Sequence, residues 1–199
     1  MKKISLLLLC LFLATGAFTS CNNLALENEA EYLWQEAFAE ILRHYHTNVP
    51  PPEDWLNWHF FLHDVDKDGI PELFIVYLAA GIWSTAIYAF ADGAITPIEG
   101  SFFAYWGIYP PTSRPGIIIQ AYGLTDLMVV DDGKLTVELA LSQPFFDTDE
   151  QLWHINGVEV TQEEFAETFN SLMPEGMSEG GANIFPTVIT EYAIQNIIR

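Results

Sequence analysis

The 199-residue chain has few basic residues and few cysteines. Its 7 Lys and Arg stand against 27 Asp and Glu, which gives a formal net charge of −20 at pH 7. Proteins that bind DNA or RNA need a positively charged surface, so this balance argues against a nucleic-acid partner. It also excludes electrostatic adsorption to an anionic bilayer. A disordered acidic tail is excluded as well, because half of the residues are hydrophobic and 14% are aromatic.

The usual catalytic signatures are also missing from the sequence. It has no glycine-rich loop that could cradle phosphates, and Gly81-Ile82-Trp83-Ser84 lacks the glycine that follows the serine of a nucleophile elbow. His59 and His63 have a spacing that suits zinc on a helix, but on the strand predicted here they would lie roughly 13 Å apart. We therefore predict a protein that is not an enzyme. A hydrolase or inhibitor with a site assembled from scattered acids is an alternative.

Residues 1–20 have the layout of a secretory signal peptide. A positive start at Lys2 and Lys3 precedes an apolar run over residues 6–14, which is too short to cross a bilayer as a mature helix. The segment Phe18-Thr19-Ser20-Cys21 resembles the lipobox of bacterial lipoproteins, whose cysteine becomes the lipidated first residue of the mature chain. Phe18 replaces the aliphatic residue that is usual at its position.

Cysteine usage supports lipidation of Cys21. Cys10 would be removed with the signal peptide, so Cys21 would be the only thiol left and no intramolecular disulfide could form. Loss of two lysines leaves five basic residues against 27 acidic ones, a net charge of about −22. We predict an extracytoplasmic protein that is anchored to the membrane through an acylated Cys21. The alternative is a secreted soluble protein whose signal peptide is cut near Ser20.

For the mature chain, the sequence predicts a tether over residues 21–26 and a single α+β domain over residues 27–199. Apolar residues recur every three or four positions between Ala30 and Tyr45, which indicates an amphipathic helix that must end before Pro50. Between residues 55 and 155, short apolar segments alternate with turn signals, which predicts an antiparallel β-meander sheet. Helices return near the C-terminus, at residues 161–172 and 187–198.

Local signals place several of these elements. Asp92-Gly93 and Asp132-Gly133 are hairpin turns, and Thr161 forms a capping box with Glu164. Residues 117–119 are all isoleucine, which predicts a strand that is buried on both faces. In the strand over residues 134–141, alternation predicts one buried face made of Leu135, Val137, Leu139 and Leu141.

One constellation carries recognisable chemistry. Residues 60–76 read FFLHDVDKDGIPELFIV, with Asp64, Asp66 and Asp68 at alternate positions and Glu72 four residues beyond. Ca²⁺ takes six to eight oxygen ligands at about 2.3–2.6 Å, and carboxylates that alternate on a tight turn converge on one point. Gly69 permits the sharp reversal of the backbone. Without a cation, four carboxylates this close in sequence would repel one another.

The loop is not an EF-hand, because Ile75 stands where that motif has a bidentate glutamate and the flanking segments are strand-like. It resembles instead the calcium loop of FG-GAP blades and bacterial VCBS repeats, in which a DxDxDG turn joins two strands. This resemblance implies side-chain ligands from Asp64, Asp66, Asp68 and Glu72, and a backbone ligand from Ile70. The segment DVDKDGIPEL, together with the later run over residues 154–165, is also similar to uncharacterised secreted lipoproteins of bacteria. A propeller needs several such blades, and the chain has one copy.

We therefore predict one structural calcium site, with a Kd on the order of 10⁻⁴–10⁻³ M as in other extracellular modules. Mg²⁺ suits the loop less well, since it prefers rigid octahedral geometry and retains its waters. The alternative is an acidic hairpin turn that binds no ion.

A second segment is dense in aromatic residues. Exposed aromatic side chains stack on sugars or on partner proteins, so this segment could form a binding surface for a glycan or a protein. In a chain this rich in aromatics, a core strand followed by a proline-rich turn is the simpler interpretation. The residues concerned, next to Pro110-Pro111, are Phe102, Phe103, Tyr105, Trp106 and Tyr109.

Overall fold

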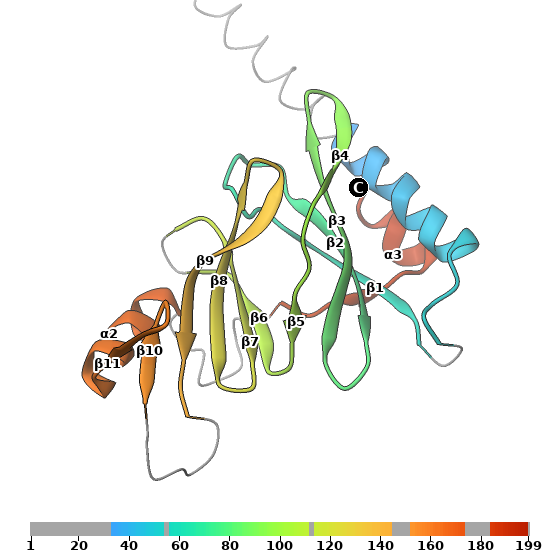
Figure 1. Cartoon of the computed structure of the whole chain (residues 1–199). Coiled ribbons are helices and arrows are strands. Elements are labelled where there is room, and N and C mark those ends of the chain that lie inside the picture. The colour runs from blue at the N-terminus through green and yellow to red at the C-terminus, as the bar shows by residue number, and fades with distance from the viewer. Residues whose placement is uncertain (1–32, 54–55, 112–113, 145–151, 174–183, 199) are drawn as a thin grey trace, which may run out of the picture.

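The computed structural model of the chain describes residues 33–53, 56–111, 114–144, 152–173 and 184–198 (Figure 1). The signal peptide, Cys21 and the tether predicted from the sequence lie outside these residues. The first element is a helix over residues 33–48. It ends before Pro50, where the sequence pattern predicts its end.

Most of the described chain forms antiparallel strands, with a few short helices, so the α+β class predicted from the sequence is confirmed in broad terms. The strands build two six-stranded sheets where one was expected. The first sheet has the order β12-β1-β2-β3-β4, with β5 also paired to β3, and the second has the order β11-β10-β9-β8-β7-β6. In chain order the elements are β1 Trp58–His63, β2 Glu72–Leu78, β3 Ile82–Ala91, β4 Ala94–Ile98, β5 Phe103–Ala104, β6 Gly107–Tyr109, β7 Ile117–Ala121, β8 Leu124–Asp131, β9 Lys134–Ser142, β10 Trp153–Ile155, β11 Val158–Val160, α2 Gln162–Leu172, β12 Thr187–Val188 and α3 Glu191–Gln195.

The two sheets share a central hydrophobic core. Phe61 of β1 and Phe74 of β2 are directly paired across the first sheet, and their rings stack at a centroid separation of 4.5 Å. Ile117 and Ile119 of the second sheet belong to the same core. Alternation along β1 and β2 turns every second side chain to this side, because successive residues of a strand face opposite ways.

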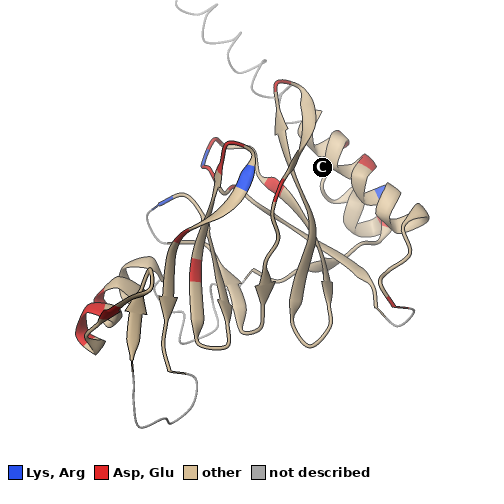
Figure 2. Ribbon diagram, in the orientation of Figure 1, with Lys and Arg blue, Asp and Glu red and all other residues tan. Residues whose placement is uncertain are grey.

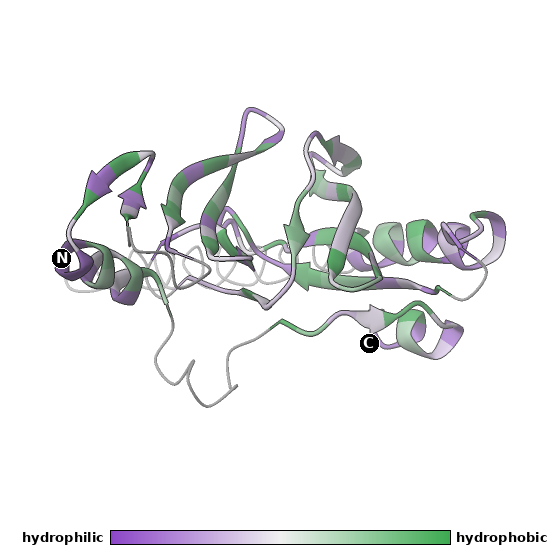
Figure 3. Cartoon of the chain, turned by 60° about the horizontal axis from the view of Figure 1, so that its bottom comes forward, coloured by the Kyte–Doolittle hydropathy of each residue, from purple (hydrophilic) through white to green (hydrophobic). Residues whose placement is uncertain are grey.

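The other faces of the two sheets are covered by helices, which lie at the two outer sides of the molecule (Figure 3). Phe38 and Leu42 of the first helix pack with Leu73 and Ile75 of β2 and with Ile194 of α3, all of them fully buried. On the second sheet, Phe165 and Leu172 of α2 pack against Ile118 of β7. The three consecutive isoleucines thus enter two cores, which confirms a strand buried on both faces.

The prediction that β9 has a single buried face is wrong. The pairing of β8 with β9 shifts register between Leu127 and Met128, so that one residue of β9, Glu138, is left over as a bulge. Leu135 therefore faces the central core, whereas Leu141 faces the core beneath α2. Val137 is 49% exposed. A bulge changes the face of every later residue, because the side-chain period of a strand is two.

The hairpin turns and the helix cap follow the sequence signals. Asp92 and Asp132 have positive φ values of 53° and 46°, each followed by a glycine with positive φ, as a tight hairpin turn needs. Thr161 accepts a hydrogen bond from the backbone of Glu164 and closes the capping box. The helix predicted over residues 187–198 is shorter than expected. Its first residues pair with β1 as β12, and only Glu191–Gln195 are helical.

Candidate metal centre

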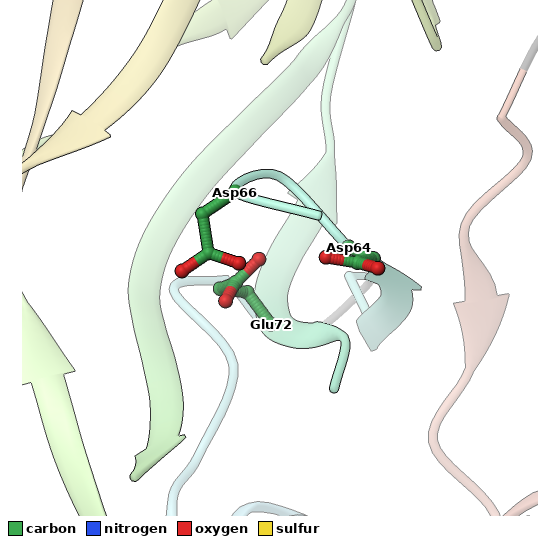
Figure 4. Close-up of side chains that lie close together, drawn as sticks. All are labelled: Asp64, Asp66 and Glu72. Atoms are coloured by element: carbon green, nitrogen blue, oxygen red, sulfur yellow. The ribbon is translucent and has the colours of Figure 1, made fainter. Parts of the chain in front are cut away.

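The acid loop, residues 64–71, connects β1 to β2. The two strands pair in register as far as His63 opposite Glu72, so Glu72 begins β2 at the mouth of the loop. The side chains of Asp64, Asp66 and Glu72 turn toward one another (Figure 4). One carboxylate oxygen from each lies within 4.8 Å of the other two, a separation at which a single cation could contact all three.

The backbone of the loop holds these carboxylates in place. Asp64 Oδ2 accepts a hydrogen bond from Gly69 N–H at 3.1 Å, and Asp66 Oδ1 accepts one from Asp68 N–H at 3.1 Å. Glu72 Oε2 accepts one from Val65 N–H at 2.7 Å. Gly69 has a φ of +94°, so the turn requires glycine there for its backbone conformation. The loop is therefore ordered by its own acids.

Glu72 is the buried member of the cluster, whereas Asp64 is half-buried and Asp66 is exposed. Glu72 is 3% exposed, and desolvation raises its pKa to about 7, against the lowering effect of the hydrogen bond from Val65 N–H. Desolvation also raises the pKa of Asp66, and the neighbouring charges of Asp68 and Asp64 add to the rise. Among the described residues, the buried Oδ1 atom of Asp64 has no hydrogen-bond partner. A buried oxygen of this kind is costly unless something pairs with it.

The structure brings together three of the four carboxylates predicted as ligands. Asp68 is exposed and outside the three-carboxylate cluster, and its Oδ1 accepts a hydrogen bond from Ile70 N–H at 2.7 Å. The side chain of Ile70 is half-buried and packs against the core beneath the first helix. Asp68 and Ile70 thus shape the turn, whereas Asp64, Asp66 and Glu72 form the cluster.

Sequence reasoning missed the segment that supports the acid loop from the second sheet. Gly116 N–H donates to Val65 O at 2.6 Å, and His63 Nε2 lies 2.9 Å from Gly116 O. Because a carbonyl oxygen can only accept, His63 Nε2 is the donor in this contact, and burial lowers the pKa of His63. The structure places His63 half-buried between the loop and this segment. Gly116 is 50 residues from Asp66 in sequence, so no local pattern could reveal the contact.

The aromatic segment divides between the surface and the core. Tyr105 and Trp106 are 47% and 43% exposed, and Phe103 is half-buried. Tyr109 is 9% exposed and packs with Leu127 in the core beneath α2, so its assignment to an exposed binding surface is wrong.

Comparisons with protein-family models, with curated proteins and with solved structures give no match to this chain. Within the described residues, no helix is both long enough and apolar enough to cross a membrane.

Proposed function

We propose that the acid loop binds one Ca²⁺ ion, and that the ion has a structural role. The observation that carries the proposal is the convergence of Asp64, Asp66 and Glu72 within 4.8 Å, with a buried oxygen of Asp64 that is otherwise unpaired. A cation at this point would satisfy that oxygen and neutralise the buried charge of Glu72. The cluster draws all its oxygens from one turn and one strand end, so a bound ion would close the β1–β2 connection.

Calcium fits this donor set better than the other common divalent ions. The cluster offers only carboxylate oxygens, which excludes the nitrogen and sulfur ligands that zinc prefers. Ca²⁺ tolerates irregular geometry and six to eight ligands, whereas Mg²⁺ demands a near-ideal octahedron. Asp68, the carbonyl of Ile70 and water would complete the shell in our proposal, as the resemblance to DxDxDG loops implies.

The cellular setting that we propose is the bacterial cell envelope. The order of charge, apolar run and cysteine in residues 1–21 supports a lipoprotein that is held at the membrane through Cys21. Extracellular calcium modules bind with a Kd of about 10⁻⁴–10⁻³ M, which suits a structural site outside the cytoplasm. The protein is then a non-catalytic envelope lipoprotein whose fold calcium stabilises.

Thermal unfolding in calcium and in chelator tests the metal proposal. With calcium at about 100 times the Kd, binding adds about 2.7 kcal/mol to the free energy of unfolding. A chain of this size gains roughly 2–4 °C in Tm for each kcal/mol, so we expect a rise of about 5–10 °C. Asp66→Ala should abolish this rise. Asp132→Asn is the control, because Asp132 is likewise an aspartate in the turn between two paired strands but belongs to no cluster of three carboxylates among the described residues.

Two further measurements sharpen the test. Asp68→Asn tests the fourth predicted ligand separately from the three-carboxylate cluster. We expect this variant to lose less of the calcium-dependent rise in Tm than Asp66→Ala does. Titration calorimetry with Mg²⁺ should give weaker binding than with Ca²⁺. Identical melting curves of the unaltered protein in calcium and chelator would refute the calcium site.

A further inference from the structure

A row of aromatic side chains runs across the end of the molecule opposite the acid loop. Neighbouring ring centroids along it lie 4.2–6.4 Å apart. Four of its six members are between 40% and 47% exposed. The members of this aromatic row, in spatial order, are Tyr77, Trp83, Phe103, Tyr122, Tyr105 and Trp106.

The topology explains why residues from 77 to 122 meet here. Successive hairpins of an antiparallel sheet turn at alternate ends, and the acid loop turns at one end. The connections β2–β3, β5–β6 and β7–β8 all turn at the other end (Figure 1). The backbone N–H groups of Tyr105 and Trp106 donate to Gln120 O at 2.9 and 3.1 Å, which joins the β5–β6 connection to the end of β7.

The rings are held in place before any ligand arrives. Trp83 Nε1–H donates to Ala79 O at 3.0 Å, and its ring lies 4.2 Å from that of Phe103. Phe103 in turn lies against Gly81, where a Cβ would come within 2.4 Å of its ring. Rings that are already stacked lose little side-chain entropy on binding, so such a surface can bind a partner at low cost.

The described segments that carry the aromatic row are also free of formal charge. The segments over residues 73–91, 100–111 and 115–125 contain no Asp, Glu, Lys or Arg, although 17% of the chain is charged. Figure 2 shows charged residues on the opposite loops, on the helices and on strands of the second sheet, while the β2–β3, β5–β6 and β7–β8 connections are uncharged. A protein of net charge −20 thus carries the aromatic row on uncharged segments, and a ligand that fits the row needs no charge.

We propose that the aromatic row binds a neutral glycan chain. Sugar rings have apolar C–H faces that stack on aromatic rings, and hydroxyl edges that hydrogen-bond to neutral donors and acceptors. The row offers four aromatic side chains that are 40–47% exposed, together with the phenol groups of Tyr105 and Tyr122. Its extended shape suits a linear chain of sugars. An acidic polysaccharide is disfavoured by the charge of the protein, and a basic partner finds no carboxylate in the row.

Affinity electrophoresis of the purified protein in gels that contain a polysaccharide tests this proposal. The probes are three neutral polymers, hydroxyethyl cellulose, laminarin and glycol chitin, with polygalacturonate as the acidic comparison. We expect retardation by at least one neutral polymer, no retardation by polygalacturonate, and no effect of salt on the binding, because no ion pair is involved. Trp106→Ala and Tyr105→Ala should each lower the affinity about tenfold.

Tyr192→Ala is the matched control, because Tyr192 is a 76% exposed aromatic residue on α3, outside the row. It should bind as the unaltered protein does. All variants should keep the calcium-dependent rise in Tm, which shows that they are folded and separates this proposal from the metal site. Failure of all three neutral polymers to retard the protein overturns the proposal. It is equally overturned if Trp106→Ala instead abolishes self-association or sedimentation with phosphatidylcholine vesicles, since the row would then serve a second copy or a membrane.

Discussion

Removal of the buried charge of Glu72 gives the sharpest test of the acid loop. In the folded protein the pKa of Glu72 is about 7, compared with an ordinary value of 4.5. The carboxyl therefore holds its proton more tightly in the folded than in the unfolded state. Protonated Glu72 therefore contributes to the free energy of unfolding. This contribution is fully present below pH 4.5 and is lost as the pH rises through about 7.

The size of this effect follows from the two pKa values. At about 1.4 kcal/mol per pH unit, their difference corresponds to roughly 3 kcal/mol of unfolding free energy at pH 8. Glu72→Gln keeps the shape of the side chain and an oxygen that can accept the hydrogen bond from Val65 N–H, but it carries no charge. In chelator at pH 8 we expect the variant to unfold roughly 6–12 °C higher than the unaltered protein, and at pH 4.5 the difference should vanish.

Calcium should bring the melting temperatures of the two proteins close together, because the roughly 2.7 kcal/mol that the ion adds to the unaltered protein is about as large as the cost of the buried charge. The unaltered protein gains stability from the ion, whereas the variant has lost one of the three clustered carboxylates and should gain little. Differential scanning calorimetry at both pH values, with calcium or chelator, measures all four conditions. Glu159→Gln controls for the general loss of one negative charge, because Glu159 lies exposed on β11. If Glu72→Gln melts below the unaltered protein in chelator at pH 8, the reasoning about buried charge is wrong.

Three other substitutions test separate parts of the molecule. Cys21→Ala should move the protein from the membrane fraction to the soluble fraction, and continued membrane retention on cell fractionation would contradict lipidation. Gly116→Ala should lower the free energy of unfolding by about 1–3 kcal/mol, because φ is +125° and a Cβ would lie 2.7 Å from Leu127 Cδ1. Denaturant unfolding measures this loss, and calcium binding should weaken with it, since Gly116 supports the acid loop. Thr161→Ala removes the cap of α2 and should cost about 1 kcal/mol, whereas Thr161→Ser should cost much less.

Features set by neighbours in the sequence were the predictable ones. The turn at Asp132-Gly133 depends on adjacent residues and the capping box at Thr161 on residues three positions apart, and both are present. The first helix was predictable for the same reason, because its apolar stripe repeats every three or four residues and a proline follows. The register shift in β9 was not predictable. A bulge arises from pairing with β8, and the alternation of Leu135 to Leu141 contains no sign of it.

Some features of the candidate site could likewise be predicted from the sequence and others could not. The spacing of Asp64 and Asp66 and the glycine at position 69 determined by themselves that an acidic turn would form, because a tight turn depends on local backbone preferences. Only the tertiary structure decided that Glu72 would be buried, that Asp68 would stay exposed, and that Gly116 would close against Val65. The aromatic row also depends on tertiary structure, since its members are spread over residues 77–122 and meet only when alternate hairpins turn at one end. Burial and long-range pairing depend on how whole sheets pack, and that information is not contained in any short segment of the chain.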